Sequence, residues 1–138
     1  MIPTPQSSVP FPPFPTGAAT IDVDAPLAFT ETGSGLKYRI LRKGKGSAPA
    51  ASATVEVHYH GWLDDGTVFD SSFERKASIS FPLNRVIAGW TEGMQLVGEG
   101  GTIELLIPSA LGYGARGAPP VIPPHATLHF WVELLKVR

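Results

Sequence analysis

Apolar and polar residues alternate along several short segments of the chain, a spacing that is typical of half-buried β-strands. The alternation is longest near the C-terminus, where Leu128, Phe130 and Val132 are separated by more polar or amphipathic residues. An Asp-Asp-Gly-Thr turn at 64–67 indicates that the strand after it pairs with the strand before it as a hairpin. We expect strands at 36–40, 55–60, 68–70, 79–83, 102–107 and 127–137.

One segment, 86–94, has the spacing of a helix instead. Its apolar residues recur every three to four positions, at Val86, Ile87, Trp90 and Met94. We expect Asn84 to cap this helix. Gly89 removes a side chain next to the indole of Trp90, which would leave the ring bare as the floor of a cavity. The alternative is that Trp90 is an ordinary core residue.

These elements predict an α+β fold, in which one short helix packs across the concave face of a strongly bent antiparallel sheet. So short a helix cannot cover the whole sheet, and apolar side chains should therefore remain open around Trp90. The connection 109–125 is rich in Gly and Pro and also carries apolar residues, which favours a fixed, partly buried loop. A concave apolar pocket of this kind is the first place to expect ligand binding.

The N-terminus has a different composition. Six prolines within residues 1–18 exclude a helix or a central strand there. We expect a Pro-rich mobile tail and linker over 1–26 and one ordered domain over 27–138. The tail contains apolar residue–proline pairs, such as Val9-Pro10 and Phe14-Pro15, which could visit an apolar pocket of its own or of a neighbouring molecule. The alternative is a free disordered tail.

Composition narrows the choice of function. The 138 residues carry a formal net charge of −1 without any basic run, which gives no support to a nucleic-acid partner. No apolar stretch is long enough to span a membrane. The chain has no Cys, which excludes disulfides and thiol chemistry. With no signal-peptide pattern at the N-terminus, we expect a cytoplasmic protein, although a chain already trimmed of such a peptide would look the same.

Five motifs occur in order along residues 34–138, namely VHYHG at 57–61, DGTVFDSS at 65–72, VIAGW at 86–90, GYG at 112–114 and IPPHATL at 122–128. Together they resemble the FKBP-type peptidyl-prolyl cis-trans isomerases. The resemblance implies a bent sheet of five to six strands around a short helix, as expected above. It also implies an enzyme that accelerates rotation of X-Pro peptide bonds and assists protein folding. The alternative is a non-catalytic peptide-binding or chaperone module that has kept the pocket.

The resemblance assigns roles to individual residues. Tyr59, Asp70 and Tyr113 take the catalytic positions, with a hairpin cap as the alternative role for Asp70. Ile79 or Phe81 replaces a family aromatic residue in a part of the chain that is shorter here, and Trp131 should face away from the pocket. The substrate-binding positions are Phe69, Ile79, Phe81, Val86, Ile87, Trp90, Ile122 and Phe130.

The resemblance also implies partners. These are proline-containing peptides, unfolded protein clients and macrolide inhibitors such as rapamycin or tacrolimus, bound by a monomer without a metal or cofactor. The residues themselves suggest two other kinds of site. His58 and His60 have the spacing of two metal ligands on one strand face, but no third ligand is evident. Ser71 and Ser72 have no base in register that would make a nucleophile of either.

Overall fold

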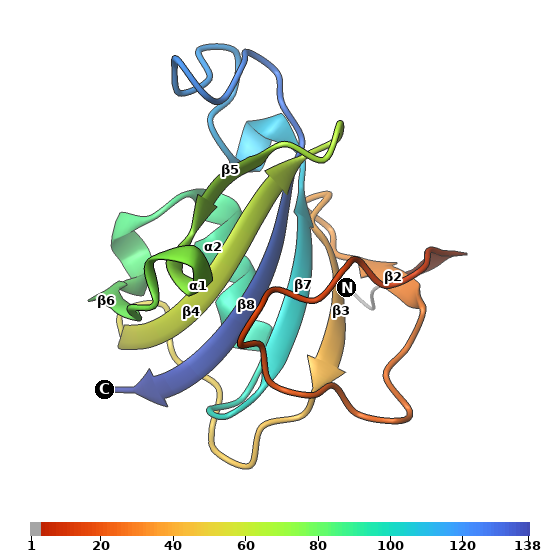
Figure 1. Cartoon of the computed structure of the whole chain (residues 1–138), viewed down its shortest axis with the longest axis vertical. Coiled ribbons are helices and arrows are strands. Elements are labelled where there is room, and N and C mark those ends of the chain that lie inside the picture. Colours follow the sequence, from red (N-terminus) through yellow and green to blue (C-terminus); the bar gives the residue numbers. More distant parts are fainter. Residues whose placement is uncertain (1–3) are drawn as a thin grey trace.

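The computed structural model describes residues 4–138, which form one antiparallel sheet with two short α-helices (Figure 1). The strands are β1 (Thr4–Ser8), β2 (Ala28–Glu31), β3 (Lys37–Arg42), β4 (Thr54–Leu63), β5 (Val68–Ser71), β6 (Ile79–Pro82), β7 (Thr102–Ile107) and β8 (Leu128–Val137). The helices are α1 (Ser72–Arg75) and α2 (Ala88–Gly93). The α+β class and the bent sheet around a short helix are thereby confirmed.

The strand order is β1-β2-β3-β7-β8-β4-β5, and β6 pairs with the other end of β4. The sheet has eight strands where five to six were expected, because β1 and β2 from the N-terminal region extend it beyond β3. The expected hairpin is confirmed, since β4 and β5 pair antiparallel across the Asp-Gly turn. None of the helices among residues 4–138 is long and apolar enough to cross a membrane.

The main core lies between the concave face of the sheet and α2 (Figure 1). It contains Trp90 and Met94 from the α2 region and inward-facing residues of β7 and β8. The helix approaches β7 so closely that a Cβ atom at Gly89 would lie 2.6 Å from Cγ2 of Ile107, and one at Gly93 would lie 2.6 Å from Cδ2 of Leu105. Gly89 therefore serves close helix–sheet packing, and its missing side chain faces β7.

The opposite, convex face of the sheet is covered by residues 9–26, here called the strap. Figure 1 shows this segment crossing in front of β7 and β8, on the side away from α2. Trp131 is fully buried beneath it, and the ring centroids of Phe14 and Trp131 are 4.9 Å apart. Trp131 thus faces away from the concave side, as expected. The strap is held by these aromatic contacts where a mobile tail was expected; residues 1–3 of that tail lie outside the described residues.

A buried ion pair connects the strap to the sheet. Arg39 of β3 is 1% exposed, and its Nε donates a hydrogen bond of 2.7 Å to Oε1 of Glu104 on β7. The guanidinium also donates to the carbonyl oxygens of Val9 at 2.5 Å, Leu27 at 2.7 Å and Pro10 at 3.1 Å. A buried charge needs such partners. The strap supplies two of these carbonyls and is therefore part of the folded domain.

Two aromatic rings complete the surroundings of Arg39. Its Cζ lies 4.8 Å from the ring centroid of Phe11 in the strap and 4.2 Å from that of Phe29 in β2. We predict that Phe11→Ala lowers the free energy of unfolding by about 1–2 kcal/mol, because a desolvated cation loses an aromatic face and apolar contacts. Urea unfolding measures this change.

The matched control is Val23→Ala, since Val23 belongs to the same strap but is fully exposed. It should shift stability by less than about 0.5 kcal/mol. If Phe11→Ala and Val23→Ala leave the unfolding midpoint equally unchanged, the strap does not stabilise the domain.

Candidate active site

A cavity of about 520 Å³ opens on the concave side of the sheet, next to α2. Its walls come from β4, β5, β6, β8, the segment before α2 and the long loop after β7. The lining is mainly apolar and aromatic, as is usual for binding pockets. The residues that line it are Tyr59, Asp70, Ile79, Phe81, Arg85, Val86, Ile87, Trp90, Tyr113 and Phe130.

Trp90 is the centre of an aromatic cluster at the base of this cavity. Its ring centroid lies 5.5 Å from that of Tyr59 and 5.3 Å from that of Phe130, and both pairs are edge-to-face. Phe81 lies 5.4 Å away at a tilt of 53°. Edge-to-face packing is a favourable arrangement of aromatic rings. Trp90 is 5% exposed, so it belongs to the core and to the cavity wall at the same time.

Val86 and Ile87 reach the cavity from an extended segment, which corrects the expected helix boundaries. The helix begins at Ala88 and not at 86, and the residue before it, Ile87, makes no side-chain cap. Asn84 does not cap α2, because it lies inside a separate 3-10 turn, Leu83–Arg85. Val86 has φ −120° and ψ 178°, an extended conformation.

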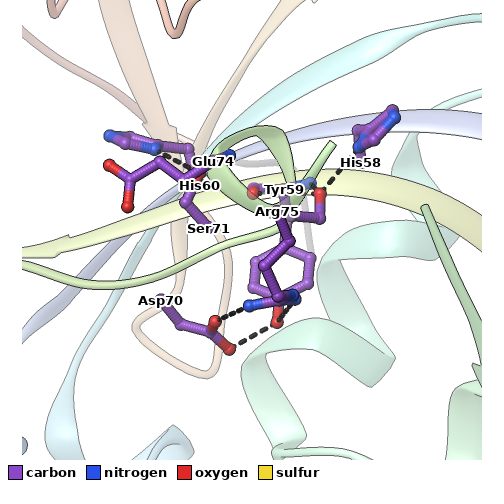
Figure 2. A network of polar contacts seen from close by, with 8 residues as sticks. His58, Tyr59, His60, Asp70, Ser71, Glu74 and Arg75 are labelled. Carbon is purple, nitrogen blue, oxygen red and sulfur yellow. Dashed lines mark hydrogen bonds and ion pairs between the residues drawn. The ribbon is translucent and has the colours of Figure 1, made fainter. Parts of the chain in front are cut away.

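Three polar side chains meet at the edge of the cavity (Figure 2). The Tyr59 hydroxyl donates to Oδ2 of Asp70, and Nη1 of Arg75 donates to Oδ1 of the same carboxylate. A second guanidinium nitrogen of Arg75, Nη2, donates to the Tyr59 hydroxyl oxygen at 3.0 Å. The closed triangle orients the phenol and gives the carboxylate a counter-charge.

The triangle affects the ionisation of its members. Partial burial alone would raise the pKa of Asp70, but hydrogen bonds from Tyr59 and Arg75 outweigh it, and the pKa lies below its ordinary value. Burial, together with the hydrogen bond to Asp70, raises the pKa of Tyr59. Asp70 is therefore charged and Tyr59 protonated throughout the neutral range.

Helix α1, which carries Arg75, was not expected from the sequence. Ser71 caps it by accepting a hydrogen bond from the Glu74 N–H at 3.3 Å, the Ser-x-x-Glu pattern of a helix start. Two histidines of β4 hold this helix start, because Nδ1 of His58 lies 2.8 Å from Oγ of Ser72 and Nδ1 of His60 lies 2.8 Å from Oγ of Ser71 (Figure 2).

These contacts give both histidines a structural role in place of the metal-ligand alternative. Within the described part of the chain, no three His, Asp or Glu side chains gather as a metal site would require. The pKa of His60 is lowered because the ring is partly buried. His60 is therefore neutral at neutral pH.

The structure brings together all but two of the residues that the sequence assigned to the site. Phe69 does not line the cavity but packs behind Phe130 with the ring centroids 5.4 Å apart. Ile122 is 6% exposed and belongs to the main core. Both support the cavity wall from behind. Ile79 and Phe81 both line the cavity, although only one of them was expected to replace the family aromatic residue.

Two arginines were missed. Arg75 forms the triangle with Asp70 and Tyr59, and the Ser-x-x-Glu pattern just before it is the feature that would have placed it on a helix. Arg85 lines the cavity, whereas Asp70 was the only charged residue among those that the sequence assigned to the site. The one sign in the sequence that Arg85 lines the cavity is its position directly before Val86, which was expected to bind substrate.

The long loop after β7 is fixed, as its composition indicated. Ala118 and Ile122 form an isolated β-bridge with hydrogen bonds of 2.8 and 3.0 Å, and the N–H of His125 donates to the carbonyl of Gly114 at 2.9 Å. This structure presents Tyr113, which is 42% exposed, to the mouth of the cavity. The strap, by contrast, lies on the other face of the sheet, so residues 9–26 do not occupy the cavity of their own chain.

Comparisons with known proteins agree with this geometry. The family model described as FKBP-type peptidyl-prolyl cis-trans isomerase matches residues 45–135. The chain is 53% identical over 107 residues to a probable FKBP-type peptidyl-prolyl cis-trans isomerase of Haemophilus influenzae, covering 78% of this chain and 44% of the relative. It is 52% identical over 99 residues to the FK506-binding protein of Neisseria meningitidis, covering 70% of this chain and 91% of that relative.

The crystal structure of FkpA from Escherichia coli superimposes with a TM-score of 0.77 at 48% identity, covering 80% of this chain and 51% of that chain. The chain spans about half or less of the length of the first curated relatives that it matches, with covered shares of 44%, 52% and 39%. The matched region contains the cavity, the aromatic cluster and the Tyr59–Asp70–Arg75 triangle. This chain belongs to the FKBP-type peptidyl-prolyl cis-trans isomerase family.

Proposed function

We propose that this chain is a peptidyl-prolyl cis-trans isomerase, acting on proline-containing peptides and unfolded protein clients in the cavity above Trp90. The observation that carries the proposal is the cavity itself, about 520 Å³ in volume and lined by aromatic rings around a buried indole. A proline ring is apolar and compact, and suits such a floor.

The physical basis is the polarity of the amide bond. Rotation about the C–N bond breaks resonance and has a barrier of about 18–20 kcal/mol. The twisted amide is less polar than the planar one. It therefore loses less hydration free energy when it moves from water into a dry aromatic cavity. An apolar site therefore binds the twisted state better than the planar state, and this difference in binding is catalysis. The rotation requires no nucleophile and no cofactor.

Individual residues have defined roles in this proposal. Trp90 supports the proline ring, while the Ile87 N–H and the Tyr113 hydroxyl donate hydrogen bonds to substrate carbonyl oxygens. Both oxygens of the Asp70 carboxylate already accept hydrogen bonds, from Tyr59 and Arg75. Asp70 therefore acts mainly by orienting Tyr59, and its charge adds little to the field in the cavity.

The first test is turnover of peptides that differ in the residue directly before proline. We expect Leu-Pro to be isomerised about tenfold faster than Glu-Pro in kcat/KM, because a carboxylate beside Trp90 loses hydration without gaining a partner. Cis-to-trans rates in a protease-free assay measure this ratio. Equal rates for the two peptides would contradict the apolar preference, and no acceleration of any peptide would favour a non-catalytic binding module.

The second test concerns Asp70 and pH. Because its folded-state pKa is lowered, its contribution to stability is complete above its unfolded pKa, about 4, and is lost as pH falls through the lower folded value. Wild type should exceed Asp70→Asn in unfolding free energy by up to about 1 kcal/mol at neutral pH, a modest value because the side chain is 41% exposed. The difference should vanish in strong acid.

Urea unfolding of both proteins at neutral and acid pH measures this difference. The matched control is Asp24→Asn, which removes an exposed carboxylate that forms only a long ion pair with Lys43, with an N–O distance of 3.7 Å. It should change stability by less than about 0.5 kcal/mol. A difference between wild type and Asp70→Asn that stays constant down to strong acid would show that the Asp70 charge is not stabilised by Tyr59 and Arg75.

The third test concerns inhibitors. We propose that the cavity binds rapamycin and tacrolimus (FK506), supported by the aromatic lining and by the name of the Neisseria relative. Binding should quench the fluorescence of Trp90, and Trp90→Leu should weaken binding about tenfold or more because a flat aromatic contact is lost. Titration by fluorescence and calorimetry measures both effects.

The matched control for this titration is Trp62→Leu. Trp62 is stacked on His129 with the ring centroids 5.4 Å apart and does not line the cavity, so its loss should leave drug affinity unchanged. Absence of binding at micromolar drug would contradict the proposal that the cavity binds macrolides.

A further inference from the structure

Arg85 is the one basic residue in the wall of the cavity. It ends the 3-10 turn Leu83–Arg85, which connects β6 to the segment before α2. Its side chain is exposed to solvent while still bordering the cavity, so it lies at the mouth and not at the floor. No proposed step of the rotation uses it.

The charge of Arg85 is not compensated within the described part of the chain. The ion pairs there involve Arg39, Lys43, Arg75, His129 and Arg138, and none includes Arg85. The carboxylate that lines the same cavity, Asp70, is already paired with Arg75. The remaining side chains of the wall carry no charge. A substrate in the cavity therefore meets a net positive charge at the mouth.

The aromatic floor and the charged mouth favour different parts of a peptide. The residue directly before proline lies beside the buried rings, where a carboxylate would lose its hydration without gaining a partner. An extended peptide advances about 3.3 Å per residue, so residues further from the proline reach the mouth. There, a carboxylate can accept two parallel hydrogen bonds from a guanidinium without losing all contact with water.

We propose that Arg85 determines substrate specificity: it selects clients that carry Asp or Glu within two residues of the proline, but not directly before it. The inference rests on the proposed isomerase function and adds a substrate class to it. Because the pair forms at an exposed position, its effect is modest, about two- to fivefold, and is weakened by salt.

The experiment uses peptides with a constant Leu-Pro centre and with Glu, Gln or Lys placed two residues before, one after or two after the proline. Cis-to-trans kcat/KM is measured for wild type, Arg85→Gln and Arg85→Glu at low and high ionic strength. The control, Lys45→Gln, removes an exposed positive charge that does not border the cavity.

In wild type, kcat/KM for the Glu peptide should exceed that for the Lys peptide about two- to fivefold at one or more of the three positions. This difference should be seen at low salt only. Arg85→Gln should bring this ratio close to one, Arg85→Glu should invert it, and Lys45→Gln should keep it. If the peptides are turned over but the ratio of kcat/KM between the Glu and Lys peptides is the same in wild type and Arg85→Gln, the inference is overturned and the isomerase function stands. Absence of turnover for every peptide overturns the isomerase function itself.

Discussion

The distance between α2 and β7 determines the shape of this molecule. Gly89 and Gly93 face the strand, and a Cβ atom at either position would collide with Ile107 or Leu105. A helix of six residues has almost no stability by itself, so its position depends on packing against the sheet. The close approach seats Trp90 within the core while leaving one side of its ring to the cavity. A larger separation would both loosen the core and remove the floor of the site.

The sheet is covered on both faces, by α2 on the concave side and by the strap on the convex side. The two covers have different roles. The concave side is partly open and forms the cavity, whereas the convex side is closed by the strap over Trp131 and Arg39. Strands β7 and β8 are therefore buried on both faces along part of their length. This rigid double-sided support holds β8, which contributes Phe130 to the cavity wall.

The sequence predicted six of the eight strands, β3 to β8, several of which show a local alternation of apolar and polar residues, whereas β1 and β2 were not among the expected strands. The cavity was predicted from the five motifs in residues 34–138, whose order and spacing resemble those of the FKBP-type family. The start of α2 was wrong because Val86 and Ile87 satisfy a helical spacing while their backbone is extended, a difference that follows from the preceding 3-10 turn. The composition of a short segment does not reveal such a turn when contacts with distant parts of the chain stabilise it.

The strap was missed for a related reason. A Pro-rich segment resembles a disordered tail unless its partners are known, and the partner of Phe14 is Trp131, more than a hundred residues away in the chain. Arg39 alternates with apolar neighbours as an exposed strand residue would, yet it is buried because Glu104 faces it across β3 and β7. Pairings of this kind are set by the three-dimensional sheet, and a single sequence does not show them.

The arrangement of the strands also bears on the risk of aggregation. Unpaired strand edges attract other extended chains and so promote aggregation. Along the described sheet, the outermost strands are β1 at one side and β5 and β6 at the other, with five, four and four residues. Long strands such as β4 and β8 are enclosed between neighbours on both sides. Extended chains therefore find little free backbone to pair with along the edges of the described sheet.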